Sequence, residues 1–186
     1  MRRRDFVTSL LLCGLVGGCA STYGQSELLR AQADAPYQLA SGDRLRIIVF
    51  GQDSLSNSFS VDGAGNIAMP LIGSVRAQGS TTQQLSSAIE ARLRGGFLRE
   101  PRVSVEVEAY RPFFALGEVA AAGQYPFING MTVEKAIAVA GGFTPRAAQS
   151  SVDVTRIVGG RSVTASVPLS FAVRPGDTIK VRERFF

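Results

Sequence analysis

Apolar positions in the first half of the chain follow strand spacing, then helix spacing, then strand spacing again. Residues 103–108 alternate apolar and polar side chains and predict a strand with one buried face; residues 44–49 also alternate, but Ile48 makes the predicted strand partly two-sided. Between them, residues 81–94 predict a helix with one apolar face, formed by Leu85, Ala88, Ile89 and Leu93. Thr81 and Gln84 have capping-box spacing at its start.

The second half of the chain repeats this order. Residues 113–119 and 178–181 predict strands, and residues 152–167 predict a hairpin around a glycine pair. Thr132 caps a second predicted helix, whose buried face consists of Val133, Ala136, Ile137 and Ala140. Strands grouped around a single helix, twice over, predict an α+β fold of two small domains with a boundary near residues 110–112.

A glycine-rich loop at residues 62–66 predicts a tight hairpin between the strands on either side, residues 59–61 and 67–69. No helix follows the loop, and the Lys-Ser/Thr pair of a phosphate-binding loop is absent. The glycine pair at residues 141–142 ends a helix and begins none. We therefore assign nucleotide binding to neither.

One short pattern occurs twice. Gly42-Asp43 and Gly176-Asp177 are each followed by one residue, an aliphatic residue, a cation and a second aliphatic residue. Glycine can take positive φ in a tight turn, and aspartate can accept hydrogen bonds from nearby backbone N–H groups where a strand begins. We interpret both as structural turns, not as a catalytic pair.

The N-terminus has the organisation of a secretory signal peptide. Arginines at positions 2–4 precede an apolar stretch, residues 6–16, that is far shorter than the ~20 residues of a membrane-spanning helix. Cys19 follows small residues and resembles the lipid-modified cysteine of bacterial lipoproteins. We therefore expect residues 1–18 to be removed, Cys19 to carry the lipid, and residues 19–36 to form a lipidated tether.

Two alternatives to this interpretation stay open. An ordinary signal peptide cut near Ala20 would leave Cys19 without a role. The arginines fit both the general secretion signal and the twin-arginine signal. Ala20 follows the cysteine where an aspartate would indicate retention in the inner membrane, so we expect sorting to the outer membrane.

The amino-acid composition limits which partners and which catalytic groups the protein can have. Removing the signal peptide takes away three arginines and Asp5, so the formal net charge falls from +5 to +3. The remaining cations are scattered, which argues against nucleic acid as a partner. Histidine and tryptophan are absent, so the commonest general base, the commonest metal ligand and the preferred platform for sugar stacking are missing. We expect no metal, no cofactor and no catalytic site.

Two clusters deserve a chemical interpretation. Glu106 and Glu108 point to the same side of a predicted strand, about 7 Å apart, a spacing that invites comparison with the paired carboxylates of glycosidases. Nothing nearby desolvates either carboxyl, so a solvent-facing strand surface is favoured. At the domain boundary, residues 110–114 (Tyr-Arg-Pro-Phe-Phe) suit sugar contact, but packing between domains or subunits is favoured.

Longer segments resemble two known domains. Residues 37–47, 59–73 and 101–105 resemble the polysaccharide biosynthesis/export domain, here a small mixed-sheet domain with one helix at residues 37–110. Residues 116–145 resemble the soluble-ligand-binding β-grasp domain, which has a ubiquitin-like fold, here at residues 111–186. In this order and behind a lipid-modified cysteine, they resemble the outer-membrane polysaccharide export lipoproteins.

The resemblance implies a function and partners. Such a protein is a non-catalytic part of a translocon for capsular or extracellular polysaccharide, held by lipid at the periplasmic face of the outer membrane. It forms a homo-oligomeric ring around the polysaccharide and works with an inner-membrane copolymerase. Full-length members continue into a C-terminal membrane-spanning helix, so we expect this short member, ending at Phe186, to need a separate outer-membrane β-barrel.

Two other functions stay open from the residues alone. The first is a scaffold lipoprotein that binds polysaccharide or peptidoglycan without transporting it. The second is a periplasmic enzyme that cleaves polysaccharide with carboxylates. Ring formation would separate the translocon from the scaffold, and loss of activity on carboxylate substitution would identify the enzyme.

Overall fold

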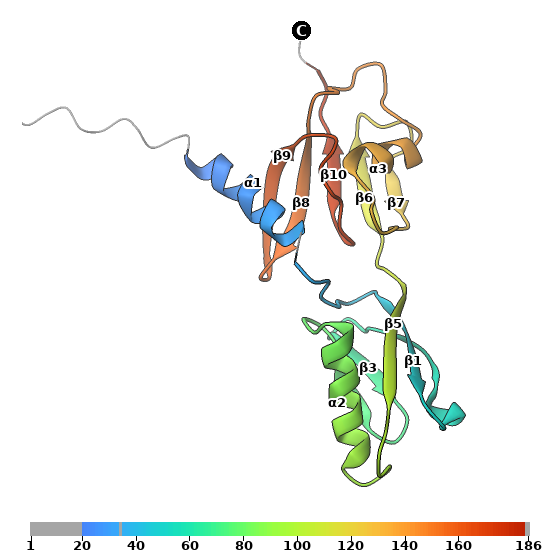
Figure 1. The fold of residues 1–186 in the computed structure, drawn as a ribbon. Helices are drawn as coiled ribbons and strands as arrows, with labels where there is room; N and C mark the ends of the chain where they lie inside the picture. Colours follow the sequence, from blue (N-terminus) through green and yellow to red (C-terminus); the bar gives the residue numbers. More distant parts are fainter. Residues whose placement is uncertain (1–19, 34, 185–186) are drawn as a thin grey trace, which may run out of the picture.

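A computed structural model describes residues 20–33 and 35–184 and divides them into two lobes joined by a narrow junction (Figure 1). Each lobe has its own hydrophobic core: one is built from residues between Leu39 and Val105, and the other from residues between Phe113 and Val181 together with Leu29. The chain crosses the junction twice, before β1 and again between β5 and β6 (Figure 1). The expected α+β fold of two small domains is confirmed.

The first domain packs one helix against short antiparallel strands. Strands β1 (Arg44–Val49), β2 (Asn57–Ser60) and β5 (Val103–Ala109) form a sheet in the order β2-β1-β5, and a short 3-10 helix, η1 (Asp53–Leu55), joins β1 to β2. Helix α2 (Thr82–Arg94) packs on β5 and begins with the predicted capping box. Its buried side chains are Leu85, Ile89 and Leu93, whereas Ala88, expected on the same face, is exposed.

The predicted hairpin around residues 62–66 is wrong. β2 pairs with β1, whereas β3 (Asn66–Met69) pairs with β4 (Gly73–Arg76) in a separate two-stranded sheet. The loop does form a tight turn, in which Asp62 Oδ1 accepts from the backbone N–H groups of Ala64 and Asn66. A local turn signature identifies the turn, but it does not decide which strand each neighbour pairs with.

The second domain is a five-stranded mixed sheet with one face covered by helices. Its strands are β6 (Phe113–Gly117), β7 (Gly123–Tyr125), β8 (Val152–Val158), β9 (Arg161–Val167) and β10 (Thr178–Val181). They lie in the order β7-β6-β10-β8-β9, with β6 and β10 parallel and the other pairs antiparallel. Helix α3 (Val133–Val139) begins at the predicted cap Thr132 and buries Val133, Ala136 and Ile137 in the core. The mixed sheet with α3 packed on it is the expected β-grasp arrangement, and α1 is a further helix on the same face.

Residues 20–33, expected as part of a tether, form a helix. This helix, α1 (Ala20–Ala33), packs against β9, and its Leu29 is fully buried in the core of the second domain (Figure 1). The expected tether is therefore, over this part, a docked element. The predicted signal peptide (1–18) and Cys19 lie outside the described residues. Within the described part of the chain, none of the helices has the length and apolar character needed to cross a bilayer.

Candidate functional site at the junction between the domains

The two Gly-Asp turns noticed in the sequence meet at one residue, Arg111, between the domains. Gly42 of the first domain and Gly176 of the second both approach the Arg111 side chain. A Cβ atom on Gly176, where φ is +84°, would lie 2.6 Å from Arg111 Nε. Only glycine allows both the backbone conformation and this close approach. The linker arginine is thus held between one turn from each domain.

Asp43 anchors the first turn to the linker. Its carboxylate is fully buried; Oδ1 accepts from the backbone N–H of Arg111 at 3.0 Å, and Oδ2 accepts from the backbone N–H of Ala40 at 2.9 Å. The Arg111 guanidinium lies 3.6 Å from Oδ2, with 29% of its side chain exposed. These contacts tie the start of β1 to the residues that lead into the second domain.

An aromatic cluster surrounds this carboxylate. The Tyr37 hydroxyl donates to Asp43 Oδ2 at 2.6 Å and accepts from Arg111 Nη1 at 2.9 Å. The Tyr37 ring packs edge-to-face on Tyr110 at 4.9 Å, and Tyr110 packs edge-to-face on Phe127 of the second domain at 5.4 Å. Burial, and then the hydrogen bond to Asp43, raise the pKa of Tyr37 far above its usual value of 10.0. The hydroxyl therefore stays a hydrogen-bond donor at any physiological pH.

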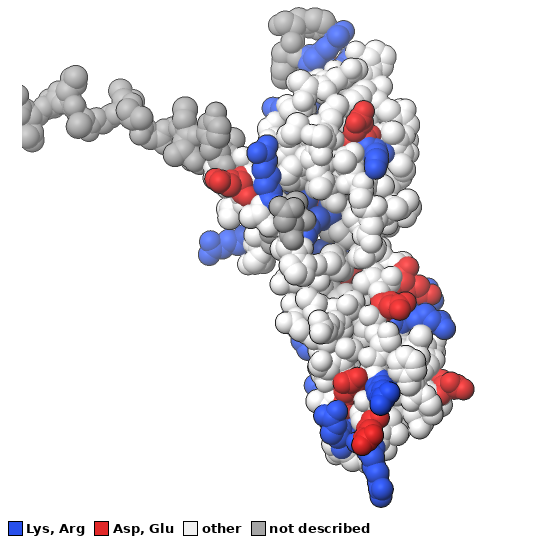
Figure 2. All heavy atoms as spheres, viewed as in Figure 1, with Lys and Arg blue, Asp and Glu red and all other residues white. Residues whose placement is uncertain are grey.

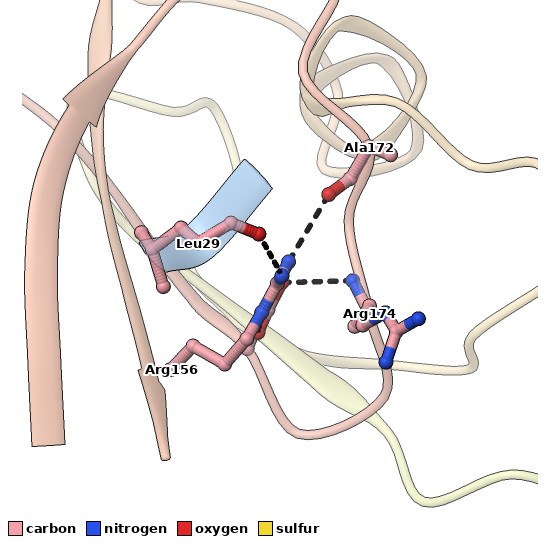
Figure 3. A network of polar contacts seen from close by, with 5 residues as sticks. Leu29, Arg156, Ala172 and Arg174 are labelled. Atoms are coloured by element: carbon pink, nitrogen blue, oxygen red, sulfur yellow. Dashed lines mark hydrogen bonds and ion pairs between the residues drawn. The ribbon is translucent and has the colours of Figure 1, made fainter. Parts of the chain in front are cut away.

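Asp177 performs the same task inside the second domain, with a buried partner (Figure 3). It accepts two hydrogen bonds from Arg156, at 2.8 Å from Nε and 2.7 Å from Nη2, and one from the backbone N–H of Arg174 at 2.8 Å. The remaining Arg156 donors reach the carbonyl oxygens of Leu29 in α1 and of Ala172. Asp177 is fully buried and Arg156 is 4% exposed. This ion pair therefore attaches α1 to the second domain.

The interpretation of the Gly-Asp turns as structural is confirmed. In each turn the aspartate accepts from the backbone N–H three residues earlier, at Ala40 and at Arg174. Both carboxylates face an arginine of their own. They belong to different domains and do not form a pair with each other.

Glu106 and Glu108 are the solvent-facing residues that the sequence favoured. Both are exposed, and each has an arginine of β1 nearby: Glu106 pairs with Arg46 in the strand register, and Glu108, beside a register shift, accepts from Arg44 Nε at 2.9 Å. The Ser58 hydroxyl, and then the charge of Arg44, lower the pKa of Glu108. A glycosidase acid needs a raised pKa, so this site has the opposite electrostatics.

Residues 110–114 pack the domain junction, as favoured. Phe113 is fully buried in the second core and stacks on Tyr125 at 5.8 Å, while Tyr110 and Arg111 belong to the junction cluster. Phe114 differs from them, because it points away from the core and is 39% exposed.

Sequence reasoning missed Arg156. The signal was present, because Arg156 occupies an inward position in the alternation of β8, in phase with buried Val152 and Val154. The other buried charged residues among those described are Asp43 and Asp177, and on the face shown in Figure 2 cations and anions are interspersed. The described residues contain no group of His, Cys, Asp and Glu side chains that could hold a metal ion.

Comparison with known proteins agrees with this two-domain layout. Residues 31–108 match the family described as polysaccharide biosynthesis/export protein, and residues 113–165 match the SLBB domain. The chain is 33% identical over 124 residues to the exopolysaccharide production protein ExoF of Rhizobium meliloti (strain 1021). That match covers 60% of this chain and 29% of the relative, so the chain spans well under half of that protein.

The fold and the junction define a two-domain protein with a small helix-and-sheet domain followed by a β-grasp domain. The first of these domains matches the polysaccharide biosynthesis/export family, and the second matches the SLBB domain. In this structure, the buried carboxylates of Asp43 and Asp177 accept hydrogen bonds that hold turns.

Proposed function

We propose that this protein is a non-catalytic component of a translocon for capsular or extracellular polysaccharide, anchored at the periplasmic face of the outer membrane. The observation that carries the proposal is the order of the two domains, an export domain followed directly by an SLBB domain. The relative ExoF is named for exopolysaccharide production. In this proposal the subunits form a homo-oligomeric ring that conducts the polysaccharide.

The junction suits ring assembly. Head-to-tail contacts between copies close into a ring only when the rotation from one copy to the next is fixed. In a two-domain subunit, that rotation depends on the angle between the domains. Asp43 and Tyr37 hold the linker residue Arg111 through part-buried hydrogen bonds, and Gly176 of the second domain packs against the Arg111 side chain. The chain also crosses the junction twice, so both domains are tied to the same linker. A subunit built this way presents the same pair of surfaces in every copy.

The anchor of this proposal is a lipid on Cys19. Cys19 directly precedes α1, which is docked on the second domain through Leu29. A lipid at this point would hold the second domain next to the membrane and leave the first domain on the periplasmic side. The other proposed partners are an inner-membrane copolymerase, which would contact the ring on its inner-membrane side, and a separate outer-membrane β-barrel, which would contact it on its outer-membrane side.

Deletion of the gene tests the proposal. A mutant should lose polysaccharide from the cell surface and accumulate it in the periplasm, and wild-type protein should restore export. A Cys19→Ala variant should fail to restore it, whereas Cys13→Ala, which changes the other cysteine, should restore it fully. Unchanged export in the mutant would contradict the proposal. Longer, uncleaved chains on the surface would indicate a polysaccharide-cleaving enzyme instead.

A further inference from the structure

The outer face of the five-stranded sheet carries an ordered row of side chains that the junction does not use. Helices α1 and α3 lie on the other face, where Leu29 and Val133 share the core with Phe113, Ala115 and Ile179. Outward-pointing residues alternate with these along every strand. Because helices cover only one side, the outer face is open to a ligand.

Strand register places one residue of each strand in a single line across this face. The pairings that fix the line are Thr178 with Phe114, Thr178 with Thr155, Thr155 with Thr164, and Phe114 with Gln124. In sheet order the row is therefore Gln124, Phe114, Thr178, Thr155 and Thr164, which we call the polar row. All five side chains are uncharged, and all are exposed or half-buried. At about 4.8 Å between strands, the row is about 19 Å long.

The chemistry of the polar row fits a sugar chain. Phe114, 39% exposed, offers a ring face to the apolar C–H surface of a sugar. Thr155 and Thr164 share one hydrogen bond, with 2.7 Å between their Oγ1 atoms, and keep further donor and acceptor capacity for a ligand. β-Branched side chains on a sheet have few rotamers, so these hydroxyls are held in place before anything binds.

The neighbouring row adds charge. It contains Leu116, Lys180, Asp153 and Ser166 in sheet order. Arg182 lies beside Asp153, with 3.6 Å between Nε and Oδ2, and donates from Nη2 to Ser166 Oγ at 2.9 Å. Among the described residues, Lys180 has no carboxylate within ion-pair distance. Lys180, Arg182 and Asp153 together therefore carry one positive charge in excess, which complements an acidic ligand.

We infer that the polar row, with Lys180 beside it, binds an acidic polysaccharide laid across the strands, with the sugar on Phe114 and a carboxylate near Lys180. A protein partner fits this face less well, because the centre of a protein interface is apolar. Of the large exposed apolar side chains on this face, Phe114 and Leu116 lie on β6 and Ile157 lies on β8, with β10 between them, so they form no continuous apolar centre. The inference rests on the proposed function, because it names the surface that contacts the exported polymer.

Binding of polysaccharide fragments to the full chain tests the inference. The probes are oligosaccharides from partial hydrolysis of the producing organism's own surface polysaccharide, and the same fragments with their carboxyl groups reduced. Phe114→Ala should weaken binding of both probes about tenfold. Lys180→Gln should weaken binding of the acidic probe several-fold at low salt, with little effect on the reduced probe. Thr155→Val with Thr164→Val removes both hydroxyls but keeps the β-branched shape, and should also weaken binding several-fold.

Matched controls separate binding from folding. Phe97→Ala removes an exposed phenylalanine of the first domain, and Lys135→Gln removes a cation of α3; both variants should bind as the wild type does. Phe114→Leu keeps an apolar side chain at this position, so the variant should fold normally. Because it lacks the aromatic ring, it should bind the probes more weakly than the wild type does. When the acidic probe is added, the nuclear magnetic resonance signals that shift should come from residues of β6, β10, β8 and β9.

The outcomes distinguish this inference from the proposed function. Wild-type binding by the Phe114, Lys180 and threonine variants would overturn the inference, and so would a surface polysaccharide without acidic groups. If the gene deletion still abolishes export, the proposed function stands while this binding face is rejected. Variants that bind normally but lose self-association would show that a second copy occupies the face, which also contradicts the inference.

Discussion

Replacing Asp177 by alanine should destabilise the second domain strongly. The substitution removes both hydrogen bonds from the carboxylate to Arg156 and the one from the Arg174 backbone. Arg156 then remains 95% or more buried with carbonyl partners but no counter-charge, since only 4% of it is exposed. Breaking a buried ion pair by removing one partner costs about 3–5 kcal/mol. Small domains are stable by about 5–15 kcal/mol, so this is a large part of the total.

Two other aspartate substitutions provide comparisons for the stability loss of Asp177→Ala. Asp153→Ala breaks a surface ion pair with Arg182, whose side chain is 46% exposed, and should cost less than about 1 kcal/mol. Asp43→Ala removes the equivalent carboxylate at the junction, where Arg111 reaches water, so the loss should be about 1–3 kcal/mol. We expect the order Asp177, Asp43, Asp153, from the largest to the smallest effect.

Urea unfolding followed by far-UV circular dichroism measures these differences, because the chain has no tryptophan to report by fluorescence. Two domains can unfold in separate transitions, so each variant should be compared transition by transition. If Asp177→Ala costs no more than Asp153→Ala, the buried pair does not hold the second domain together and the reasoning fails.

Three further predictions follow from the same contacts. Leu29→Ala should cost about 2–5 kcal/mol and expose α1 to proteases, whereas Leu28→Ala, at a 53% exposed position, should do neither; equal proteolysis of the two would contradict the docking of α1. Gly176→Ala should cost about 1–2 kcal/mol from its positive φ alone and more from the clash with Arg111, and a smaller cost in an Arg111→Ala background would demonstrate the clash in a double-mutant cycle. The Thr144 hydroxyl, and then Arg146, lower the pKa of Glu118 below 4.5, so its contribution to stability is present above pH 4.5 and is lost as pH falls through the folded-state pKa. Glu118→Gln should therefore lower stability at neutral pH, and the difference from wild type should vanish in acid.

Local patterns predicted the elements well because local physics dominates them. The alternation of residues 103–108 became β5, and Thr81 with Gln84 formed the capping box of α2. Pairing is not local, which explains the wrong hairpin at residues 62–66. The sequence indicates a turn there, but Phe59 of β2 pairs with Leu45 of the preceding strand β1 and not with β3, which follows the turn.

The docked helix and the buried arginine escaped prediction for a related reason. α1 has a polar, alanine-rich sequence, and it is fixed by Leu29, whose carbonyl accepts from Arg156, 127 residues later. No pattern within residues 20–33 announces a partner so far away. The junction is an intermediate case. The sequence showed both Gly-Asp turns and Arg111, but only the fold brings these three features together.

The mass of the assembled protein, extracted from the membranes of producing cells in mild detergent, tests the central claim most directly. The account predicts a single closed oligomer, with a lipid-bearing Cys19 at the mature N-terminus and polysaccharide bound to it. A particle of one subunit under every extraction condition, free of both lipid and polysaccharide, would contradict it.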